Sequence, residues 1–438
     1  MTITLRAGST NSGILQNGNE FCTIDGSNNA AFSNNVTVSG ASTTAPSMVS
    51  GALTVNTTLT VPVGTTAARP VGVVGMVRLN STTGYSEYYN GTSWISVVGS
   101  NPSLTQKAIF GYGQNSIDLT STTNLVSNTG VVSNDVTGVG TIRRYTAAAG
   151  YGTDKAIFGY GLAAANVSMT NLVSNTGVVS TDVTGVGTAR NALAAAGYGT
   201  DKAIFGYGTT GTEVSITNLV SNTGVVSTNV TGVGTARRAL AAAGYGTDKA
   251  IFGYGYTGVA YASMTNLVSN TGVVSTDTTG VGTARNNIAA TGYGTDKAIF
   301  GYGMTPSRVS MTNLVSNTGV VSTDTTGVGT TRAVPAAAGY GTDKAIFGYG
   351  QSDGGNVSMT NLVSNTGVVS TDTTGVGTAR IGLAAAGYGT DKAIFGYGYT
   401  TGNVSMTNLV SNTGVVATDT TGVGTARNGC AAAGFSLS

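Results

Sequence analysis

Short apolar stretches separated by polar, glycine-containing turns recur from residue 107 to the end of the chain. One representative unit contains four of them, at 193–199 (LAAAGYG), 202–207 (KAIFGY), 215–221 (SITNLVS) and 225–228 (VVST). Stretches this short, joined by Thr-Asp, a polar loop and Asn-Thr-Gly, are typical of β-strands connected by turns. The pattern predicts a four-stranded antiparallel sheet, whose strands we call A, B, C and D.

Seven copies of this unit follow one another. The lysines of the protein mark the register, with spacings of 48, 47, 47, 48, 47 and 48, at Lys107, Lys155, Lys202, Lys249, Lys297, Lys344 and Lys392. One arginine per unit keeps the same spacing, at Arg143, Arg190, Arg237, Arg285, Arg332, Arg380 and Arg427. A period near 47 occurs in β-propeller blades and in two-helix repeats, and the richness in Gly, Ser, Thr, Asn and Val favours the blade. An all-β protein with seven blades is expected.

The two ends of the repeat array complement each other. The first unit has NPSLTQ before Lys107 and so lacks strand A, whereas AAAGF at 431–435 is a surplus strand A after the last unit. An open solenoid would need polar capping repeats, but a ring completed by the C-terminal strand leaves no open sheet edge. We therefore expect a seven-bladed β-propeller closed by that strand.

The first hundred residues do not share the repeat. Residues 36–38 and 53–61 alternate apolar and polar side chains as strands do, yet they are too few to form a core in one chain. A fibre-like, β-rich shaft in which several chains wind together is expected, and a flexible linker with incidental strands is the alternative. Residues 62–100 predict a small β-meander, with strands at 75–80, 85–89 and 93–98 and Trp94 as its core anchor. The expected domains are 1–61, 62–100 and 101–438.

Two segments resemble known families. Arg69-Pro70, Arg78, Asn80, Glu87, Tyr89-Asn90-Gly91 and Trp94 have the spacing of a module that recurs in bacteriophage tail-fibre and other virion structural proteins, which residues 61–98 resemble. The repeat resembles the kelch type of β-propeller through R-x-x-L-A-A-A-G-Y-G and K-A-I-F-G-Y-G. It departs from kelch repeats where Gly-Tyr-Gly replaces the Gly-Gly pair and Val or Leu replaces the outer aromatic residues. The kelch resemblance implies a fold but no partners.

Composition excludes several classes of function. Twenty basic and 18 acidic residues give a net charge of +2, too small for non-specific nucleic-acid binding. No apolar run reaches the roughly 18 residues of a membrane span, and no signal peptide is expected. Cys22 and Cys430 lack the companions of a disulfide or zinc motif and are expected to be free thiols.

Catalysis is not expected either. The chain has no histidine, which excludes His-based triads and His-ligated metals. The variable loops described next offer only Asp118, Glu213 and Asp353, which are scattered over different units and so do not form the paired carboxylates of a glycosidase. We therefore expect neither an enzyme nor a cofactor or metal site.

Differences between the units concentrate in two places. The B–C loops are residues 114–121, 162–166, 209–213, 256–262, 304–308, 351–356 and 399–403. The D–A junctions, the pair after each arginine of the series, are residues 144–145, 191–192, 238–239, 286–287, 333–334, 381–382 and 428–429. Both sets are expected at one end of the strands, whereas the nearly unchanged A–B and C–D turns lie at the other. Drift of exposed loops is one explanation, but drift would also change the other turns, which favours a diversified binding surface.

The candidate receptor-binding residues all lie in these loops and junctions. They are Arg144, Tyr145, Asn191, Glu213, Arg238, Tyr256, Tyr261, Asn286, Arg308, Asp353, Asn356, Tyr399, Asn403 and Asn428. Tyrosines mixed with polar side chains are typical of recognition loops. The Asp-Lys pairs of the A–B turns, in contrast, are expected to be solvated turn residues, and the arginine series is expected to brace the junctions between blades.

The resemblance to virion modules gives these features a setting. It implies a virion protein of a tail or head appendage, with the N-terminal region forming a homotrimer and attaching to other virion proteins. The propeller would then recognise a host cell-surface receptor, a glycan or a protein, with no nucleic acid and no membrane insertion involved. The alternative is a structural decoration or spacer protein of the capsid or tail without receptor binding.

Overall fold

Strands dominate the protein. The computed structural model describes residues 12–16, 19–24, 30–32, 61–82, 85–97 and 106–435, and the chain divides into two units, Met1–Val97 and Val98–Ser438. Among these described residues there is no α-helix, and one turn of 3-10 helix, η1 (Thr66–Ala68), is the sole helical element. The expected all-β fold is confirmed.

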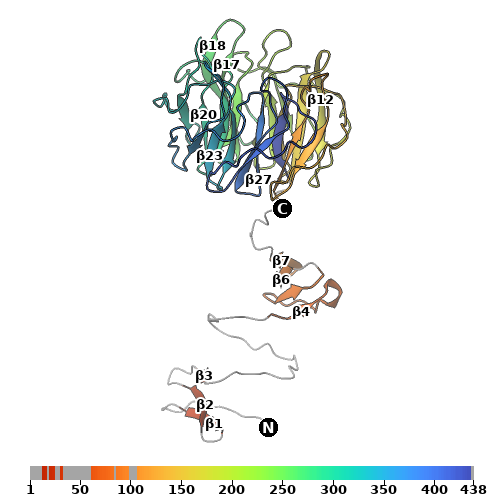
Figure 1. Ribbon diagram of the computed structural model, residues 1–438. Helices are drawn as coiled ribbons and strands as arrows, with labels where there is room; N and C mark the ends of the chain where they lie inside the picture. Colours follow the sequence, from red (N-terminus) through yellow and green to blue (C-terminus); the bar gives the residue numbers. More distant parts are fainter. Residues whose placement is uncertain are drawn as a thin grey trace. The chain divides into compact units, whose positions relative to one another are not determined.

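Residues 106–435 form seven three-stranded antiparallel sheets, in which strand B is always central (Figure 1). Numbered sheet 1 to sheet 7, their strands in the order A, B, C are β30 (Ala431–Phe435), β8 (Lys107–Gly111) and β9 (Thr123–Val126); β10 (Ala147–Tyr151), β11 (Lys155–Leu162) and β12 (Asn166–Val173); β13 (Ala194–Tyr198), β14 (Lys202–Gly206) and β15 (Thr217–Val220); β16 (Ala241–Tyr245), β17 (Lys249–Tyr256) and β18 (Tyr261–Val268); β19 (Ala289–Tyr293), β20 (Lys297–Gly301) and β21 (Thr312–Val315); β22 (Ala336–Tyr340), β23 (Lys344–Gly348) and β26 (Thr360–Val363); β27 (Ala384–Tyr388), β28 (Lys392–Gly396) and β29 (Thr407–Val410). A short hairpin, β24 (Gln351–Ser352) and β25 (Gly355–Asn356), lies in the B–C loop of sheet 6.

Seven apolar cores lie between successive sheets. Between sheets 3 and 4, Ile204 and Tyr207 of sheet 3 pack with Phe252 and Val268 of sheet 4. Strand B is buried along nearly its whole length because both of its faces meet a neighbouring sheet. Gly206 is required at this contact, since a Cβ there would lie 2.7 Å from the Phe252 ring. The same core recurs between every pair of neighbours and makes the sheets interdependent.

The sheets close into a circle. Strand A of each sheet contacts strand A of the next, and β10 of sheet 2 contacts β30, the strand A of sheet 1. β30 pairs with β8 from Ala431 opposite Gly111 to Phe435 opposite Lys107. Sheet 7 packs on sheet 1 through Tyr397 and Phe110. The C-terminal strand thus supplies the strand that the first unit lacks, as the repeat pattern predicted.

The arginine series is fully buried and joins neighbouring sheets. Arg237 donates to the carbonyl oxygens of Tyr254 (2.7 Å) and Thr235 (2.9 Å) and to Oδ1 of Asn266 (2.6 Å). Its guanidinium carbon lies 4.2 Å from the centre of the Tyr207 ring. Burial lowers the pKa of Arg237, yet an arginine keeps its charge in proteins. The expected bracing role is confirmed, with carbonyl groups and an aromatic face both used.

The predicted fourth strand is wrong in detail. Residues 225–228 form no regular strand, and only single bridges join this segment D to strand C, at Val226–Val220 and Val230–Thr217. Side chains replace the missing ladder, because Oγ of Ser227 accepts from the Leu219 N–H (2.9 Å) and Nδ2 of Asn218 donates to the Ser227 carbonyl (3.0 Å). The sheets are therefore three-stranded with an extended outer segment.

In sheet 3, strands B and C are also shorter than predicted, whereas in sheets 2 and 4 both strands are longer. Strand B of sheet 3 ends at Gly206, directly before Tyr207, which has a φ of +65°. Strand C begins at Thr217 rather than at Ser215.

The N-terminal part of the chain, Met1–Val97, contains a four-stranded sheet. Its strands, in order, are β4 (Val63–Gly64), β5 (Val77–Asn80), β6 (Tyr85–Tyr89) and β7 (Trp94–Val97). The predicted meander is confirmed for β5 to β7, and β4 adds a parallel edge strand. Its centre is polar, because the carboxylate of Glu87, fully buried, contacts Arg69 (2.7 Å), Arg78 (3.3 Å) and Asn80 (3.0 Å). Trp94 is only half-buried, so its predicted role as the core anchor is wrong.

Three further strands lie before residue 33. β1 (Ser12–Gln16), β2 (Asn19–Ile24) and β3 (Ala30–Phe32) form an antiparallel sheet in this order. They arise within Asn- and Ser-rich sequence that predicted no strand. The strands predicted at 36–38 and, apart from residue 61, at 53–61 lie outside the described residues.

Candidate functional site

The variable loops and junctions meet at one end of the seven sheets, which we call the variable face. In every sheet a residue of the D–A junction forms an isolated backbone bridge with a residue at the start of the B–C loop. The bridges are Asn428–Gln114, Arg144–Leu162, Asn191–Thr209, Arg238–Tyr256, Asn286–Met304, Ala333–Gln351 and Ile381–Tyr399. The two variable sets found in the sequence are therefore one surface.

Most of the fourteen candidate residues are half-buried within this surface. Tyr145, Asp353 and Tyr399 are exposed, and the other eleven are of intermediate exposure. Tyr145 is the most accessible tyrosine of the face, at 46% exposure, and Arg144 lies against its ring at 4.8 Å. Most of the candidate side chains are therefore partly covered by their neighbours, and only three are exposed.

Polar contacts tie the variable loops of neighbouring sheets together. Arg308 of sheet 5 pairs with Asp353 of sheet 6 at 2.7 Å. The Asn356 amide donates to the Tyr399 carbonyl (3.3 Å) of sheet 7. From sheet 7 the Asn403 amide in turn donates to the Gln114 carbonyl (3.1 Å) of sheet 1. Loops from different sheets thus hold one another in place.

Junction residues also contact the B–C loop of the preceding sheet in the ring. Asn191 donates to Asn166 at 2.6 Å, and Asn428 donates to Asn403 at the same distance. Arg144 also donates to the side-chain carbonyl of Gln114. Within the described residues, the buried Oδ1 of Asn286 and Nε of Arg308 have no hydrogen-bond partner.

One loop extends the face. β17 and β18 of sheet 4 continue as a hairpin to the Tyr256–Tyr261 pair, and the loop stands at the upper end of the sheets in Figure 1. The two tyrosine rings are 5.7 Å apart, and Arg238 lies 5.6 Å from the Tyr256 ring. Arg238 also approaches Glu213 of sheet 3 at 3.4 Å. Aromatic and charged side chains are thereby grouped between sheets 3 and 4.

A ring of backbone surrounds the axis at the variable face, and we call it the annulus. It consists of the second junction residue of each unit, always with positive φ between 49° and 62°: Tyr145, Ala192, Ala239, Asn287, Val334, Gly382 and Gly429. Hydrogen bonds run from one annulus residue to the next, for example from the Ala239 N–H to Ala192 (3.1 Å) and from the Val334 N–H to Asn287 (2.9 Å). The annulus fixes this backbone whatever side chain it carries.

A cavity of about 330 Å³ opens at the annulus. Its wall below the annulus is the third residue after each arginine of the series, which we call the collar: Thr146, Leu193, Leu240, Ile288, Pro335, Leu383 and Cys430. The buried hydroxyl of Thr146 has no hydrogen-bond partner among the described residues. Sequence reasoning missed both the collar and the cavity, although glycine in two of the seven annulus positions was a signal of positive φ.

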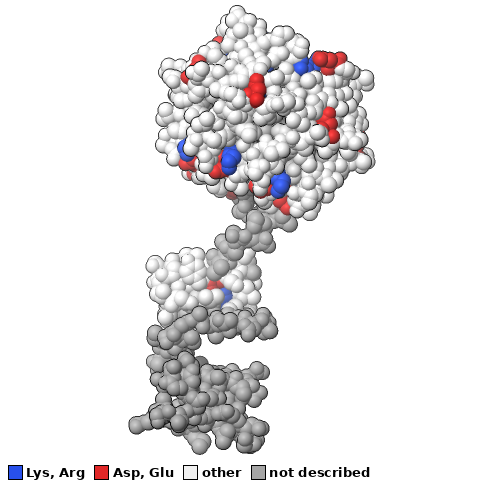
Figure 2. Space-filling view, turned by 90° about the vertical axis from the view of Figure 1, so that its left-hand side faces the viewer, with Lys and Arg blue, Asp and Glu red and all other residues white. Residues whose placement is uncertain are grey.

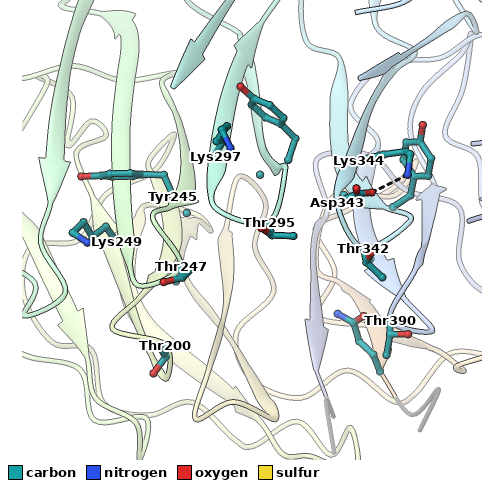
Figure 3. Close-up of a pocket in the computed structure, with 18 of the residues that line it drawn as sticks. Thr200, Tyr245, Thr247, Lys249, Thr295, Lys297, Thr342, Asp343, Lys344 and Thr390 are labelled. Atoms are coloured by element: carbon teal, nitrogen blue, oxygen red, sulfur yellow. Dashed lines mark hydrogen bonds and ion pairs between the residues drawn. The ribbon is translucent and has the colours of Figure 1, made fainter. Parts of the chain in front are cut away.

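The opposite end of the sheets, which we call the constant face, carries the A–B turns. A cavity of about 480 Å³ lies there, and four lysines, five threonines and four tyrosines contribute to its wall. Figure 3 shows these side chains coming from successive sheets, with Lys344 paired to Asp343. Lys249 pairs with Asp248 at 2.8 Å, and this hydrogen bond, together with one from Asn270, lowers the pKa of Asp248.

Charge cancels within these turn pairs. In the view of Figure 2, basic and acidic side chains form small, mostly paired spots on a largely uncharged surface. Adjacent exposed pairs of this kind contribute little energy each.

Two other classes of site have no candidate among the described residues. The described part of the chain contains no group of three or more His, Cys, Asp or Glu side chains that could hold a metal ion. No helix among the described residues is long and apolar enough to cross a membrane.

Comparisons with known proteins inform the fold alone. The sequence matches no protein-family model and no curated protein. Among solved structures, the chain is similar to a fungal alcohol oxidase of the AA5 family, solved in complex with copper. That likeness has a TM-score of 0.50 and 13% identity, and it covers 67% of each chain.

The expectation that this protein is not an enzyme is corrected by this likeness. The exclusion rested on the absence of histidine and of paired carboxylates, but the solved structure of similar fold is an oxidase. An all-β architecture of this kind can therefore carry redox catalysis, and the lack of acid–base side chains does not decide the matter.

Proposed function

We propose that residues 106–435 form a seven-bladed β-propeller that is the receptor-binding head of a virion fibre protein. Its variable face recognises a host cell-surface receptor, most simply a glycan, through the B–C loops and D–A junctions. The N-terminal region forms a homotrimer and attaches the head to other proteins of a tail or head appendage. The closed circle of seven sheets, with β30 completing sheet 1, supports the propeller.

One observation carries the proposal: sequence variation is concentrated at one end of a repeated frame, the frame being the positions that are nearly the same in all seven units. The frame positions of the seven units superimpose in sequence and in contacts, so each sheet presents its loop in an equivalent place. The variable residues join across sheets, as Arg308 and Asp353 do, and so form one surface. A rigid scaffold that varies on one face is the usual arrangement of a recognition protein.

The route of the chain supports the choice of face. Gln106, the first described residue of the ring, accepts a hydrogen bond from the Gly389 N–H (2.8 Å) at the constant face. Phe435, the last, pairs with Lys107 next to it. Because the chain enters and leaves the ring at the constant face, the variable face is free of covalent connections.

The virion setting rests on the resemblance of residues 61–98. The buried cluster around Glu87 gives that resemblance a physical basis, because Arg69, Arg78 and Asn80, which define the motif, are the partners of this carboxylate. A decoration or spacer protein would use the same module, so the behaviour of the variable face distinguishes the two.

Binding to bacteria tests the proposal. The labelled full chain is incubated with a panel of bacterial strains and an array of bacterial surface glycans, next to a variant in which all seven B–C loops have the sequence of residues 399–403. We call this protein, in which all seven loops are the same, the levelled variant. We expect it to bind at least about tenfold more weakly, because it loses several interface side chains. Circular dichroism confirms that both proteins are folded.

A matched control changes the constant face. Thr153, Thr200 and Thr247 have φ near +66°, a conformation that asparagine tolerates, so replacing them by Asn alters this face without disturbing the turns. This control should bind as the wild type does. Equal binding by the levelled variant would overturn the proposal in favour of a spacer.

Oxidase activity is a second candidate because of the likeness in fold. The described residues do not fit a copper centre of three or more His, Cys, Asp or Glu ligands, so we derive no step through copper. Oxygen consumption by the protein, with and without added Cu²⁺, in the presence of primary alcohols decides this candidate.

A further inference from the structure

The variable face contains an open cavity at the annulus. Its position on the axis allows every sheet to contribute one annulus residue and one collar residue to its wall. The B–C loops, by comparison, are spread around the rim of the ring. A ligand seated in the cavity would therefore contact all seven units together.

The backbone of the annulus is strained for most of its residues. Tyr145, Ala192, Ala239 and Val334 adopt positive φ, a conformation that is unfavourable for these residues. Glycine would remove this strain, as it does in sheets 7 and 1. Side chains that are kept at a strained position, and that differ from unit to unit, indicate a function at the cavity.

The chemistry of the wall selects a neutral ligand. None of the lining residues is an Asp, Glu, Lys or Arg. The collar offers an apolar surface from residues such as Leu193, Leu240 and Ile288, next to the unpaired hydroxyl of Thr146. Tyr145 and Asn287 add polar groups at the annulus. A ligand that fits must combine a small apolar group with hydrogen-bonding groups.

We infer that this cavity binds the terminal residue of a surface glycan, and that this residue is a neutral 2-acetamido sugar. The inference rests on the proposed function and specifies its ligand. An acetamido group has a methyl group for the collar, and its N–H and C=O can pair with Thr146 and Asn287. The volume of about 330 Å³ lies at the lower end of the range of about 300–1,000 Å³ for small-molecule sites, which suits one sugar residue.

Saturation-transfer NMR on the full chain tests this inference. The probes are the methyl glycosides of N-acetylglucosamine and N-acetylgalactosamine, and methyl glucoside is the matched control without the acetamido group. We expect transfer to be strongest at the acetamido methyl protons and absent for methyl glucoside. No transfer to either acetamido sugar, or equal transfer to all three sugars, would overturn the inference.

A cavity-filling variant locates the binding. Ala192→Tyr with Ala239→Tyr places rings in the cavity at positions whose backbone accepts tyrosine, as Tyr145 shows. It should weaken binding by about tenfold or more. Thr200→Asn, on the constant face and outside this cavity, should leave binding unchanged. Undiminished binding by the filled variant would exclude the cavity.

The reactivity of the Cys430 thiol provides a further test, which needs no substitution that fills the cavity. In a Cys22→Ser background it is the single thiol, and it lies in the collar. Bound acetamido sugar should slow its reaction with a disulfide reagent, whereas methyl glucoside should not. Equal rates with both sugars would contradict the inference.

The experiments can contradict the cavity inference and the proposed function independently of each other. If acetamido sugars do not bind while the full chain still binds bacteria through its B–C loops, the cavity inference is wrong and the proposed function stands. If they bind in the cavity but no strain or array glycan does, the proposed function is wrong.

Discussion

At the scale of single residues, the fold depends on buried polar groups as much as on apolar packing. Each arginine of the series sits between two sheets with carbonyl, amide and aromatic partners. A planar guanidinium can satisfy three acceptors and stack on a ring at once, which an ammonium group cannot do. The repeated use of arginine at this position follows from that geometry.

Arg237→Lys should lower the free energy of unfolding by roughly 2–4 kcal/mol, because the buried charge keeps its desolvation cost and loses its hydrogen bonds. Urea denaturation followed by tyrosine fluorescence measures the change. Arg238→Lys is the control, since the side chain of Arg238 is 42% exposed and the change there should be within about 0.5 kcal/mol. Equal losses would show that the buried contacts are not decisive.

A pH dependence follows from the aspartates of segment D. Burial raises the pKa of Asp277, but hydrogen bonds from Thr235 and Asn266 and the charge of Arg237 outweigh it, so the pKa is lowered overall. Its stabilising contribution is therefore complete above the ordinary carboxyl pKa of about 4. It is lost as the pH falls through the lower folded value. In sheet 3 the equivalent residue is Asn229. Its side chain accepts a hydrogen bond from the Thr188 N–H and donates one to the Thr188 hydroxyl.

Asp277→Asn should therefore destabilise the ring at pH 7 and reduce its further loss of stability between pH 5 and pH 2.5. Asn229→Asp should do the opposite, because it adds a carboxylate next to the same kind of arginine. Thermal midpoints measured across this range check both variants. Parallel pH profiles for the two variants and the wild type would contradict this account.

Residue-scale features were the hardest to predict from the sequence. The arginine bracing could be predicted because one arginine per unit recurs in step with the lysines. The annulus could not, since Tyr145 and Val334 rarely adopt positive φ and closure of the ring imposes it. The polar core around Glu87 was missed because Trp94 is the residue expected to fill a small core.

At the scale of elements, ring closure depends on one five-residue strand. β30 provides the buried Ala431, Ala433 and Phe435 to the core between sheets 1 and 2. The missing and surplus strands made this closure predictable. Segment D was mispredicted because the side chains of Asn218 and Ser227 supply hydrogen bonds that a strand makes with its backbone. Side-chain substitution of this kind leaves the apolar pattern unchanged.

Phe435→Ala should lower the free energy of unfolding by about 3–5 kcal/mol, the usual cost of removing a buried phenylalanine. Phe435→Tyr is the matched control, because the other sheets have tyrosine at this position, and it should change stability little. Denaturant unfolding compares the two variants. If Phe435→Ala is as stable as the wild type, β30 does not lock the ring.

At the scale of the whole molecule, the positions that are nearly the same in all seven units build the sheets, and the variable positions gather on one face of the ring. The seven-fold count was predicted from the spacing of the repeat, and the closure from the strand that the first repeat lacks and the last one adds. The location of the candidate residues on one face followed from strand direction, but their half-buried state and cross-sheet contacts did not, because loop sequences do not reveal partners in other sheets. The exclusion of enzymes failed because catalytic ability was inferred from side-chain types without a fold.

The proposed trimer belongs to the N-terminal region. The full chain should therefore have three times its monomer mass by light scattering, whereas a fragment of residues 98–438, a unit of its own, should be monomeric. Both should show the same thermal transition for the ring. A trimeric fragment, or a monomeric full chain, would contradict the proposed assembly.

The bridge between each D–A junction and its B–C loop has a genetic consequence. The stretch of gene that encodes the residues from one arginine of the series to the next contains both partners of a bridge, as with Asn191 and Thr209. Recombination between these near-identical repeats would move the two partners together and leave the frame unchanged. Only contacts between neighbours, such as Arg308 with Asp353, would need to be rebuilt. Such recombination would therefore exchange a variable loop together with its junction while the frame stays folded.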